Sequence, residues 1–185
     1  MAFGVATKDV EGVVSDLMRL PEGLIDKMVG DCLKVDFVHS IGQDSRYEGR
    51  PPGYPQGSTW SDVPAVYDPG CNRIVIATKF GVKRSVLHEV GHWVDKQMGH
   101  SDTEEFEDAH DYDTSHDGDG DGRIDVTDSY FTNEENGKSE AFAEAFQRHY
   151  GSFADEVLAP RKLSDNFSTK TDQHVQDLAK NGLLW

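Results

Sequence analysis

Residues 87 to 95 of the chain read Leu87-His88-Glu89-Val90-Gly91-His92-Trp93-Val94-Asp95. On a helix, His88 and His92 lie one turn apart, so their imidazoles can bind the same metal ion. Glu89 lies about 100° further round the helix, where its carboxylate can reach a water beside that ion. The alternative is a helix with two ordinary histidines, but the apolar neighbours disfavour free exposure, and buried histidines need partners. The motif therefore predicts two metal ligands and a base.

A catalytic zinc ion needs a third protein ligand and an open position. Asp95 stands where the metzincin pattern requires glycine, and Met98 stands where it requires a third histidine, so that ligand must come from elsewhere. The segment from Ser139 predicts a helix with Glu140 and Glu144 on one face, amid small and apolar residues. Carboxylates there are costly unless they meet cations or donors. We expect one to bind the metal and the other to orient a ligand histidine, the alternative being a solvated glutamate pair.

The remaining patterns predict both helices and strands. Apolar residues at helical spacing predict helices over residues 7–20, 22–29, 82–98, 139–150, 152–158 and 171–179. Alternating apolar residues predict a strand over 33–38, and a turn of Asp, Pro, Gly and Asn predicts a hairpin between strands 65–67 and 73–77. Many Gly and Pro residues fall between 41 and 64, which we expect to form a long irregular surface loop.

The two motifs together resemble a known family. Leu87–Asp95, followed some 45 residues later by Glu140-Ala141-Phe142-Ala143-Glu144-Ala145-Phe146, is similar to the catalytic domain of anthrax toxin lethal factor and its relatives, the Pro-Pro endopeptidases. The resemblance covers roughly Tyr67 to Tyr150, less an acidic insert. It implies an α+β, zincin-like (gluzincin) fold with a small mixed sheet, an active-site helix and a second helix that carries glutamates. The length of the chain predicts that this is a single domain over residues 1–185.

The resemblance also implies roles for individual residues. It makes His88, His92 and Glu140 the zinc ligands, Glu89 the general base and Glu144 a supporting carboxylate. Asp95 is a further candidate for a supporting side chain near the metal. The resemblance further implies a tyrosine, shortly before the glutamate ligand, that stabilises the oxyanion. Tyr130 is the nearest candidate, ten residues before Glu140. Tyr150 and Tyr112 are the alternatives.

These roles describe a hydrolysis of peptide bonds. Zinc lowers the pKa of its bound water, and Glu89 takes the remaining proton as the water attacks the carbonyl and then delivers it to the leaving amine. Tyr130 would help to hold the oxyanion. If strand 73–77 lies at a sheet edge beside the cleft, it could pair with an extended substrate. The expected partner is thus a protein or peptide.

An acidic segment lies between the two motifs. Residues 101–128 contain 12 Asp or Glu and one Arg. Within them, Asp117–Asp128 fits the calcium loop of EF-hands and dockerins, in which oxygen ligands surround the ion and a glycine makes the sharp bend. The predicted calcium ligands are Asp117, Asp119, Asp121, the Arg123 carbonyl and Asp128, with Asp125 at the ninth position.

The flanks of this loop are polar or mixed, so we expect an EF-like loop within an insertion over 101–137, not a complete EF-hand. A merely solvated Asp/Gly loop is the alternative. Because the loop lies between the histidine helix and Glu140, and ends two residues before Tyr130, calcium there is expected to support stability or activity.

Composition narrows the function classes further. The chain has 185 residues, enough for one domain with a sizeable core, and a formal charge of −16 at pH 7. That charge disfavours nucleic-acid and membrane-surface partners, and no apolar run approaches the ~20 residues of a membrane span. The two cysteines, Cys32 and Cys71, are expected to be unlinked thiols. We expect a monomer.

The sequence thus predicts a zinc-dependent metalloendopeptidase of the toxin or effector type, stabilised by calcium. One alternative is a zinc hydrolase that acts on non-protein amides, because the motif specifies water activation and not the acyl group. Another is a catalytically silent, calcium-dependent binding module, which the intact Glu89 disfavours. A calcium loop suits the millimolar calcium outside cells, so we expect secretion by a leaderless route or as an effector, with a cytoplasmic location as the alternative.

Overall fold

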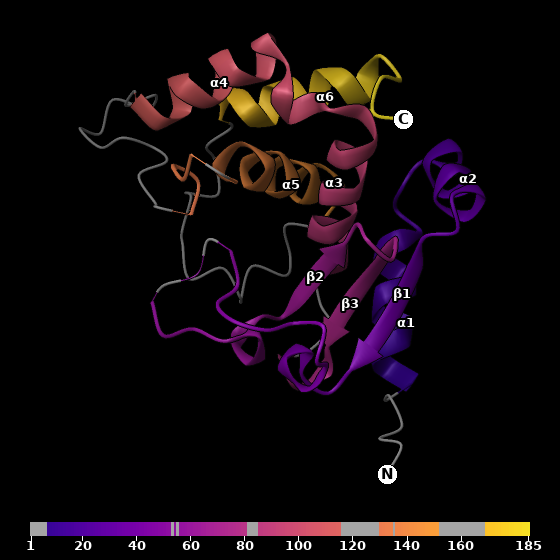
Figure 1. The fold of residues 1–185 in the computed structure, drawn as a ribbon. Helices are drawn as coiled ribbons and strands as arrows, with labels where there is room; N and C mark the ends of the chain where they lie inside the picture. The colour runs from indigo at the N-terminus through magenta and orange to yellow at the C-terminus, as the bar shows by residue number, and fades with distance from the viewer. Residues whose placement is uncertain are drawn as a thin grey trace.

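The computed structural model describes residues 7–52, 54, 56–80, 85–115, 130–134, 136–151 and 169–185. The described helices are α1 (Thr7–Leu17), α2 (Glu22–Gly30), α3 (Ser85–Met98), α4 (Glu104–Ser115), α5 (Gly137–Tyr150) and α6 (Lys170–Lys180). The described strands are β1 (Lys34–Val38), β2 (Ala65–Asp68) and β3 (Arg73–Ala77). This mixture confirms the predicted α+β class, with a small mixed sheet and two motif-bearing helices (Figure 1).

The sheet has the strand order β1-β3-β2, with β1 parallel and β2 antiparallel to β3. Every residue of β3 is buried. Ile74 and Ile76 belong to the core that includes residues of α1 and α3, whereas Val75 and Ala77 belong to a second core on the other face. Residues 73–77 therefore form the central strand, so the condition under which they could pair with a substrate is not met. Burial on both faces explains the uninterrupted apolar run of this strand.

Residues 41–64 cover that second face of the sheet. As predicted, the described residues of this segment are irregular, apart from two short 3₁₀ turns at Ile41–Gln43 and Trp60–Asp62. Ile41 and Val63 are buried against Val75 and Ala77 of β3. The segment is therefore a packed cover for the sheet and not a free surface loop.

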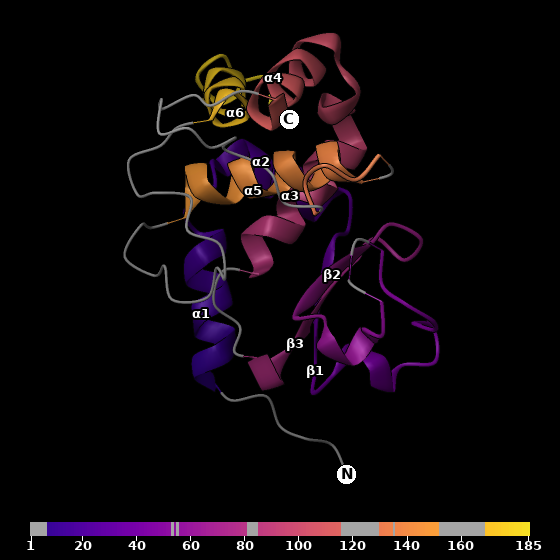
Figure 2. The same cartoon turned by 90° about the vertical axis from the view of Figure 1, so that its left-hand side faces the viewer.

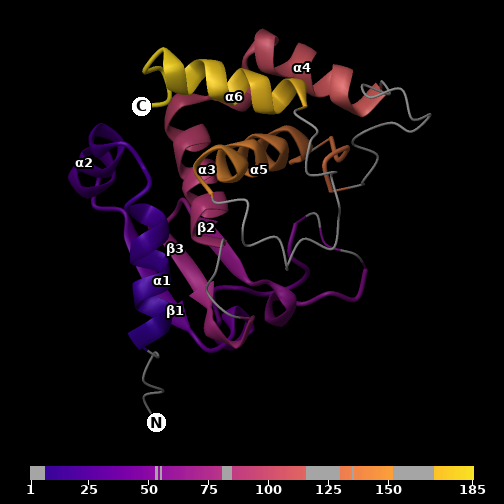
Figure 3. The same ribbon diagram turned by 180° about the vertical axis from the view of Figure 1, so that it is seen from behind.

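Helix α3 leads from the sheet towards the helices at the opposite end of the molecule, where α5 crosses it (Figures 1 and 2). The crossing is close at Gly91, where an added Cβ would lie 2.7 Å from the Cα of Ala143. Trp93, Phe142 and Phe146 are fully buried in the core that joins the two helices. Viewed from behind, α1 covers the sheet, and α4 and α6 lie on the far side of α5 (Figure 3).

Several expected boundaries differ from the structure. Helix α5 begins two residues before Ser139, because Gly137 already donates its N–H to the carbonyl of Asn133. The expected start of the histidine helix at Val82 and the expected helix 152–158 lie outside the described residues. None of the described helices is long and apolar enough to cross a membrane.

Helix α4 was not expected, because residues 111–116 are polar and appear unfavourable for a helix. Its buried side chains are one turn apart, but only Phe106 is apolar, whereas His110 and Asp113 are polar. Both polar side chains are hydrogen-bonded: His110 Nε2 lies 2.8 Å from the carbonyl oxygen of Phe131, and Asp113 accepts from two backbone N–H groups. Glutamates in its first turn suit the positive end of the helix dipole.

Candidate metal centre

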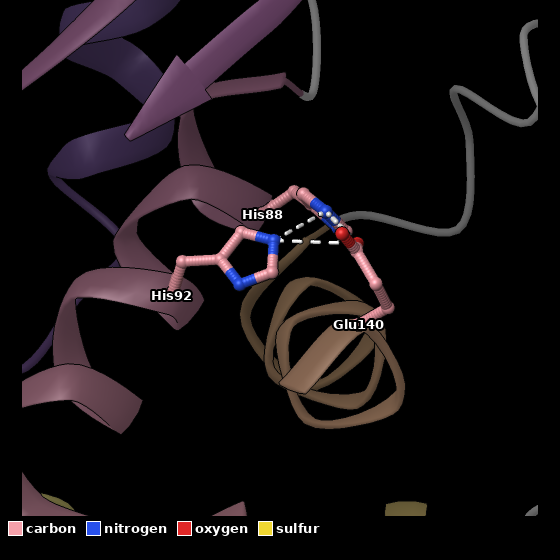
Figure 4. Close-up of side chains that lie close together, drawn as sticks. All are labelled: His88, His92 and Glu140. Carbon is pink, nitrogen blue, oxygen red and sulfur yellow. Dashed lines mark hydrogen bonds and ion pairs between the residues drawn. The ribbon is translucent and has the colours of Figure 1, made fainter. Parts of the chain in front are cut away.

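His88 and His92, from α3, and Glu140, from α5, point towards one another where the two helices cross (Figure 4). His88 Nε2 lies 3.1 Å from His92 Nε2 and 3.2 Å from Glu140 Oε2. His92 Nε2 lies 3.3 Å from the same oxygen. Three donor atoms therefore form a nearly equilateral triangle. Among the described residues, these three are grouped closely enough to hold a metal ion.

The size of this triangle fits a zinc ion. With bonds of about 2.0 to 2.1 Å in a tetrahedral site, neighbouring ligand atoms lie about 3.3 to 3.4 Å apart. The three observed separations, 3.1, 3.2 and 3.3 Å, are close to that value. Two imidazole nitrogens and a carboxylate are also a known donor set of catalytic zinc, which keeps its fourth position open. The residues present therefore fit the predicted ion.

Each ligand histidine has a polar partner on its other ring nitrogen. Nδ1 of His88 lies 3.6 Å from Glu144 Oε2, and Nδ1 of His92 lies 3.2 Å from the hydroxyl of Ser139. Such partners select the tautomer that leaves Nε2 free for a metal. Glu144 lies where a supporting carboxylate was expected. Ser139 was not foreseen, although it directly precedes Glu140.

Charges at the centre are strongly coupled. Burial opposes charging of His88, but the carboxylates of Glu140 and Glu144 hold its pKa well above the ordinary value. Burial likewise opposes ionisation of Glu140, yet the two imidazoles hold its pKa well below the ordinary value. Protons and a divalent cation would therefore compete for the same side chains.

Glu89 faces the edge of the sheet. Its Oε2 accepts a hydrogen bond of 2.6 Å from the backbone N–H of Tyr67, the third residue of β2. Burial raises the pKa of Glu89, against the opposing effect of the two imidazoles. A buried carboxyl whose pKa is raised is suited to accept a proton and to release it again.

Tyr130 contacts the carboxylate of the triangle, because its hydroxyl donates to Glu140 Oε2. Burial and the charge of Glu140 raise the pKa of Tyr130 far above its ordinary value, so the phenol stays a donor. Close packing at Gly137 allows this approach: an added Cβ there would lie 2.2 Å from the carbonyl oxygen of Phe131. His110 contacts the same oxygen through Nε2, at 2.8 Å.

The other tyrosines considered for this role lie elsewhere. Tyr112 is exposed on α4, where the amine of Lys170 lies 5.5 Å from its ring centroid. Tyr150 packs with its ring against Phe146 and His149 on α5. Tyr130 is therefore the tyrosine of the three that the structure places against a ligand.

Asp95 does not support a metal ligand. Its two carboxylate oxygens accept hydrogen bonds from the backbone N–H and the hydroxyl of Ser101, each at 2.7 Å. It therefore fixes the chain just after α3 ends, where Gly99 adopts a positive φ of 69°. The prediction that Asp95 acts beside the metal is wrong, because the carboxylate is already committed to this turn.

One further residue near the centre was missed. Burial and the negative charges of Glu89 and Glu140 raise the pKa of Tyr54 to about 12. Its phenol therefore belongs to the same electrostatic environment, although it comes from the irregular cover segment, whose sequence contains no motif. The expected calcium ligands, Asp117, Asp119, Asp121, Arg123 and Asp128, lie outside the described residues, as does Asp125.

Comparison with known proteins supports this fold. No protein-family model matches the sequence, and no curated protein matches it significantly. Among solved structures, the chain is similar to the Pro-Pro endopeptidase PPEP-2 from Paenibacillus alvei, with a TM-score of 0.56 and 20% sequence identity. The match covers 83% of this chain and 84% of that one. At this identity the likeness shows that the two chains share a fold.

Proposed function

We propose that the chain is a zinc-dependent metalloendopeptidase. The observation that carries the proposal is the triangle of His88 Nε2, His92 Nε2 and Glu140 Oε2, with the buried Glu89 on the same helix as the two histidines. A fold like that of a Pro-Pro endopeptidase supports a peptide substrate over a non-protein amide.

The residues around the centre suit the steps of peptide hydrolysis. A zinc ion held there supplies Lewis acidity, which activates water at neutral pH and polarises a carbonyl oxygen. Glu89 takes a proton from the attacking water and delivers it to the leaving amine. The hydroxyl of Tyr130, which contacts the ligand oxygen of Glu140, donates a hydrogen bond to the developing oxyanion.

Strand β2 is suited to bind an extended substrate. The carbonyl of Pro64 accepts a hydrogen bond from the N–H of Ala77 in β3. In an antiparallel ladder every second residue faces the partner strand, so the N–H of Val66 also points to β3. The backbone groups of Ala65 and Tyr67 then point to the outer edge, where the N–H of Tyr67 reaches Glu89. A substrate paired along that edge would lie beside the metal.

A matched pair of variants tests the catalytic part of the proposal. The purified, zinc-loaded protein and its Glu89→Gln variant would be incubated with a peptide library rich in Pro-Pro sequences, and cleavage read by mass spectrometry. We expect cleavage by the wild type and a loss of at least ~100-fold in Glu89→Gln. Glu11→Gln, an exposed change on α1, is the control. Equal cleavage by Glu89→Gln and the wild type would contradict the proposed base.

We also propose that calcium binds the loop Asp117–Asp128 and supports this activity, in a monomeric, secreted or effector-type protein. Support comes from the spacing of the oxygen ligands and from the place of the loop, between α4 and the Tyr130 that contacts Glu140. Removal of calcium with a calcium-selective chelator, with zinc kept saturating, should lower both Tm and turnover. Unchanged values of both would refute the calcium role.

A further inference from the structure

A row of charged side chains connects the metal centre with the C-terminal helix. Glu144 Oε2 lies 3.6 Å from His88 Nδ1, and Glu144 Oε1 lies 3.9 Å from Arg148 Nη1. Arg148 Nε and Nη2 each lie 2.8 Å from Oδ1 of Asp172. The row therefore crosses from α3 through α5 to α6. We propose that Arg148 and Asp172 are positioning residues, which hold Glu144 against the ligand His88.

Asp172 is a fixed anchor for this row. Its other oxygen, Oδ2, accepts from the backbone N–H of Thr169 at 3.2 Å, while the N–H of Asp172 donates to the hydroxyl of Thr169 at 3.1 Å. This reciprocal pair is a capping box at the start of α6. Because one oxygen completes the cap and the other meets Arg148, the carboxylate has little freedom to turn.

The start of α6 is itself held by α4. Asp113, at 3% exposure, accepts from the backbone N–H groups of Lys170 and Thr171 at 2.8 and 2.9 Å. These N–H groups have no partner within their own helix, and a buried carboxylate satisfies both of them. The position of Asp172 is thus set by two helices other than α5, which carries Arg148.

Arg148 suits the connecting place because its guanidinium is a rigid, planar fork. Two of its nitrogens meet Asp172, which leaves Nη1 directed to Glu144. A lysine could place its single charge near either carboxylate, but it could not hold both in one geometry. The guanidinium of Arg148 can therefore fix the position of Glu144 in addition to supplying a positive charge.

The charge of Arg148 acts on Glu144. The guanidinium lies beside the carboxylate of Glu144, with Nη1 3.9 Å from Oε1. An ionised Glu144 accepts the Nδ1–H of His88 and so presents Nε2 to the metal. Loss of Arg148 would remove the cation beside Glu144, which lies one helical turn from the carboxylate of Glu140.

The inference rests on the proposed metal site, so its test measures metal binding directly and does not depend on peptide cleavage. Zinc dissociation constants would be measured by competition with a chromophoric chelator, and the visible spectrum of the cobalt-substituted protein would report the ligand geometry. The variants are Arg148→Gln, Arg148→Lys and Asp172→Asn. The control is Val175→Ala, which opens a cavity under α6 at a fully buried residue outside the row.

We expect Arg148→Gln and Asp172→Asn to weaken zinc binding about 10- to 100-fold and to shift the cobalt spectrum. Arg148→Lys should recover part of the affinity, because it restores the charge without the fork. Val175→Ala should lower Tm at least as much as Arg148→Gln and Asp172→Asn do, with the zinc affinity and the cobalt spectrum unchanged. Wild-type affinity in Arg148→Gln, or equal zinc weakening in Val175→Ala, would overturn the inference. A wild type that binds zinc but cleaves no peptide would refute only the proposed function.

Discussion

The hydroxyl of Tyr130 lies against the carboxylate of Glu140, although ten residues separate the two in the sequence. The contact is made to Oε2, the same oxygen that completes the triangle with His88 and His92. The residues between them turn back, so that the N–H of Gly137 meets the carbonyl of Asn133 at 2.8 Å. This turn brings a phenol donor to the metal position.

Tyr130→Phe should therefore impair catalysis more than it impairs metal binding. Removal of one donor to an oxyanion lowers kcat about 100- to 1,000-fold. The phenol also donates to the triangle oxygen of Glu140, so zinc affinity should fall too, but by only about tenfold. Steady-state kinetics and chelator competition on the same preparation separate the two effects. A Tyr130→Phe variant with wild-type kcat would remove this residue from the mechanism.

Gly137→Ala should also lower kcat, because it displaces Tyr130 without changing that residue. An added Cβ would lie 2.2 Å from the carbonyl oxygen of Phe131, which must move and carry Tyr130 with it. We expect a fall in kcat of at least tenfold and a lower Tm, since such a backbone clash destabilises by about 1 to 3 kcal/mol.

The control for that variant is Gly30→Ala at the end of α2, where an added Cβ would meet no atom within 4 Å. Alanine is the better helix former, so Tm should stay the same or rise slightly. If Gly137→Ala behaved like Gly30→Ala, the turn would have room that the structure does not show.

The sequence could predict that His88 and His92 face the same point because their geometry is local. Residues four apart on one helix must face the same way, whatever surrounds them. The contribution of Ser139 and Arg148 depends instead on how α3, α5 and α6 cross, which no spacing within one helix encodes. The prediction for Asp95 failed for the same reason. Its closeness to His92 in the sequence suggested a place near the metal, whereas its carboxylate accepts hydrogen bonds from Ser101.

In the sheet, too, local structure could be predicted and long-range pairing could not. The hairpin of β2 and β3 was predictable, because its turn residues stand between two apolar runs. The order of strands was not, since the pairing of β1 with β3 joins segments nearly forty residues apart. One signal was overlooked: Ile74-Val75-Ile76-Ala77 is apolar on both faces, which is typical of a central strand and not of an edge.

Gly91→Ala tests how closely the two helices of the metal centre must approach. A Cβ there would lie 2.7 Å from the Cα of Ala143, so α5 would be pushed away from α3. Because Glu140 is on α5 and both histidines are on α3, we expect zinc affinity to fall at least tenfold. Chelator competition gives the value. Unchanged affinity, with the protein folded, would mean that the helices can separate without opening the triangle.

Two histidines away from the metal predict a loss of stability in acid. His100 stacks on Phe142 at 5.5 Å between ring centroids, and His174 of α6 meets the edge of Phe106 at 5.5 Å. Burial lowers the pKa of both imidazoles. Each therefore binds a proton more readily in the unfolded chain, where its pKa is about 6.5. Their neutral forms contribute stability that is fully present above about pH 6.5 and is lost as pH falls towards the lower, folded-state values.

The measurement is Tm against pH between 7.5 and 5, for the wild type and for a His100→Gln, His174→Gln double variant. We expect the wild type to lose more of its Tm on acidification, because glutamine does not titrate. His39→Gln, the same substitution at an exposed position, is the control for the change of residue type. His88 titrates in all three proteins, so it cancels from the comparison. If the double variant lost as much Tm as the wild type, the docking of α6 would not depend on these neutral imidazoles.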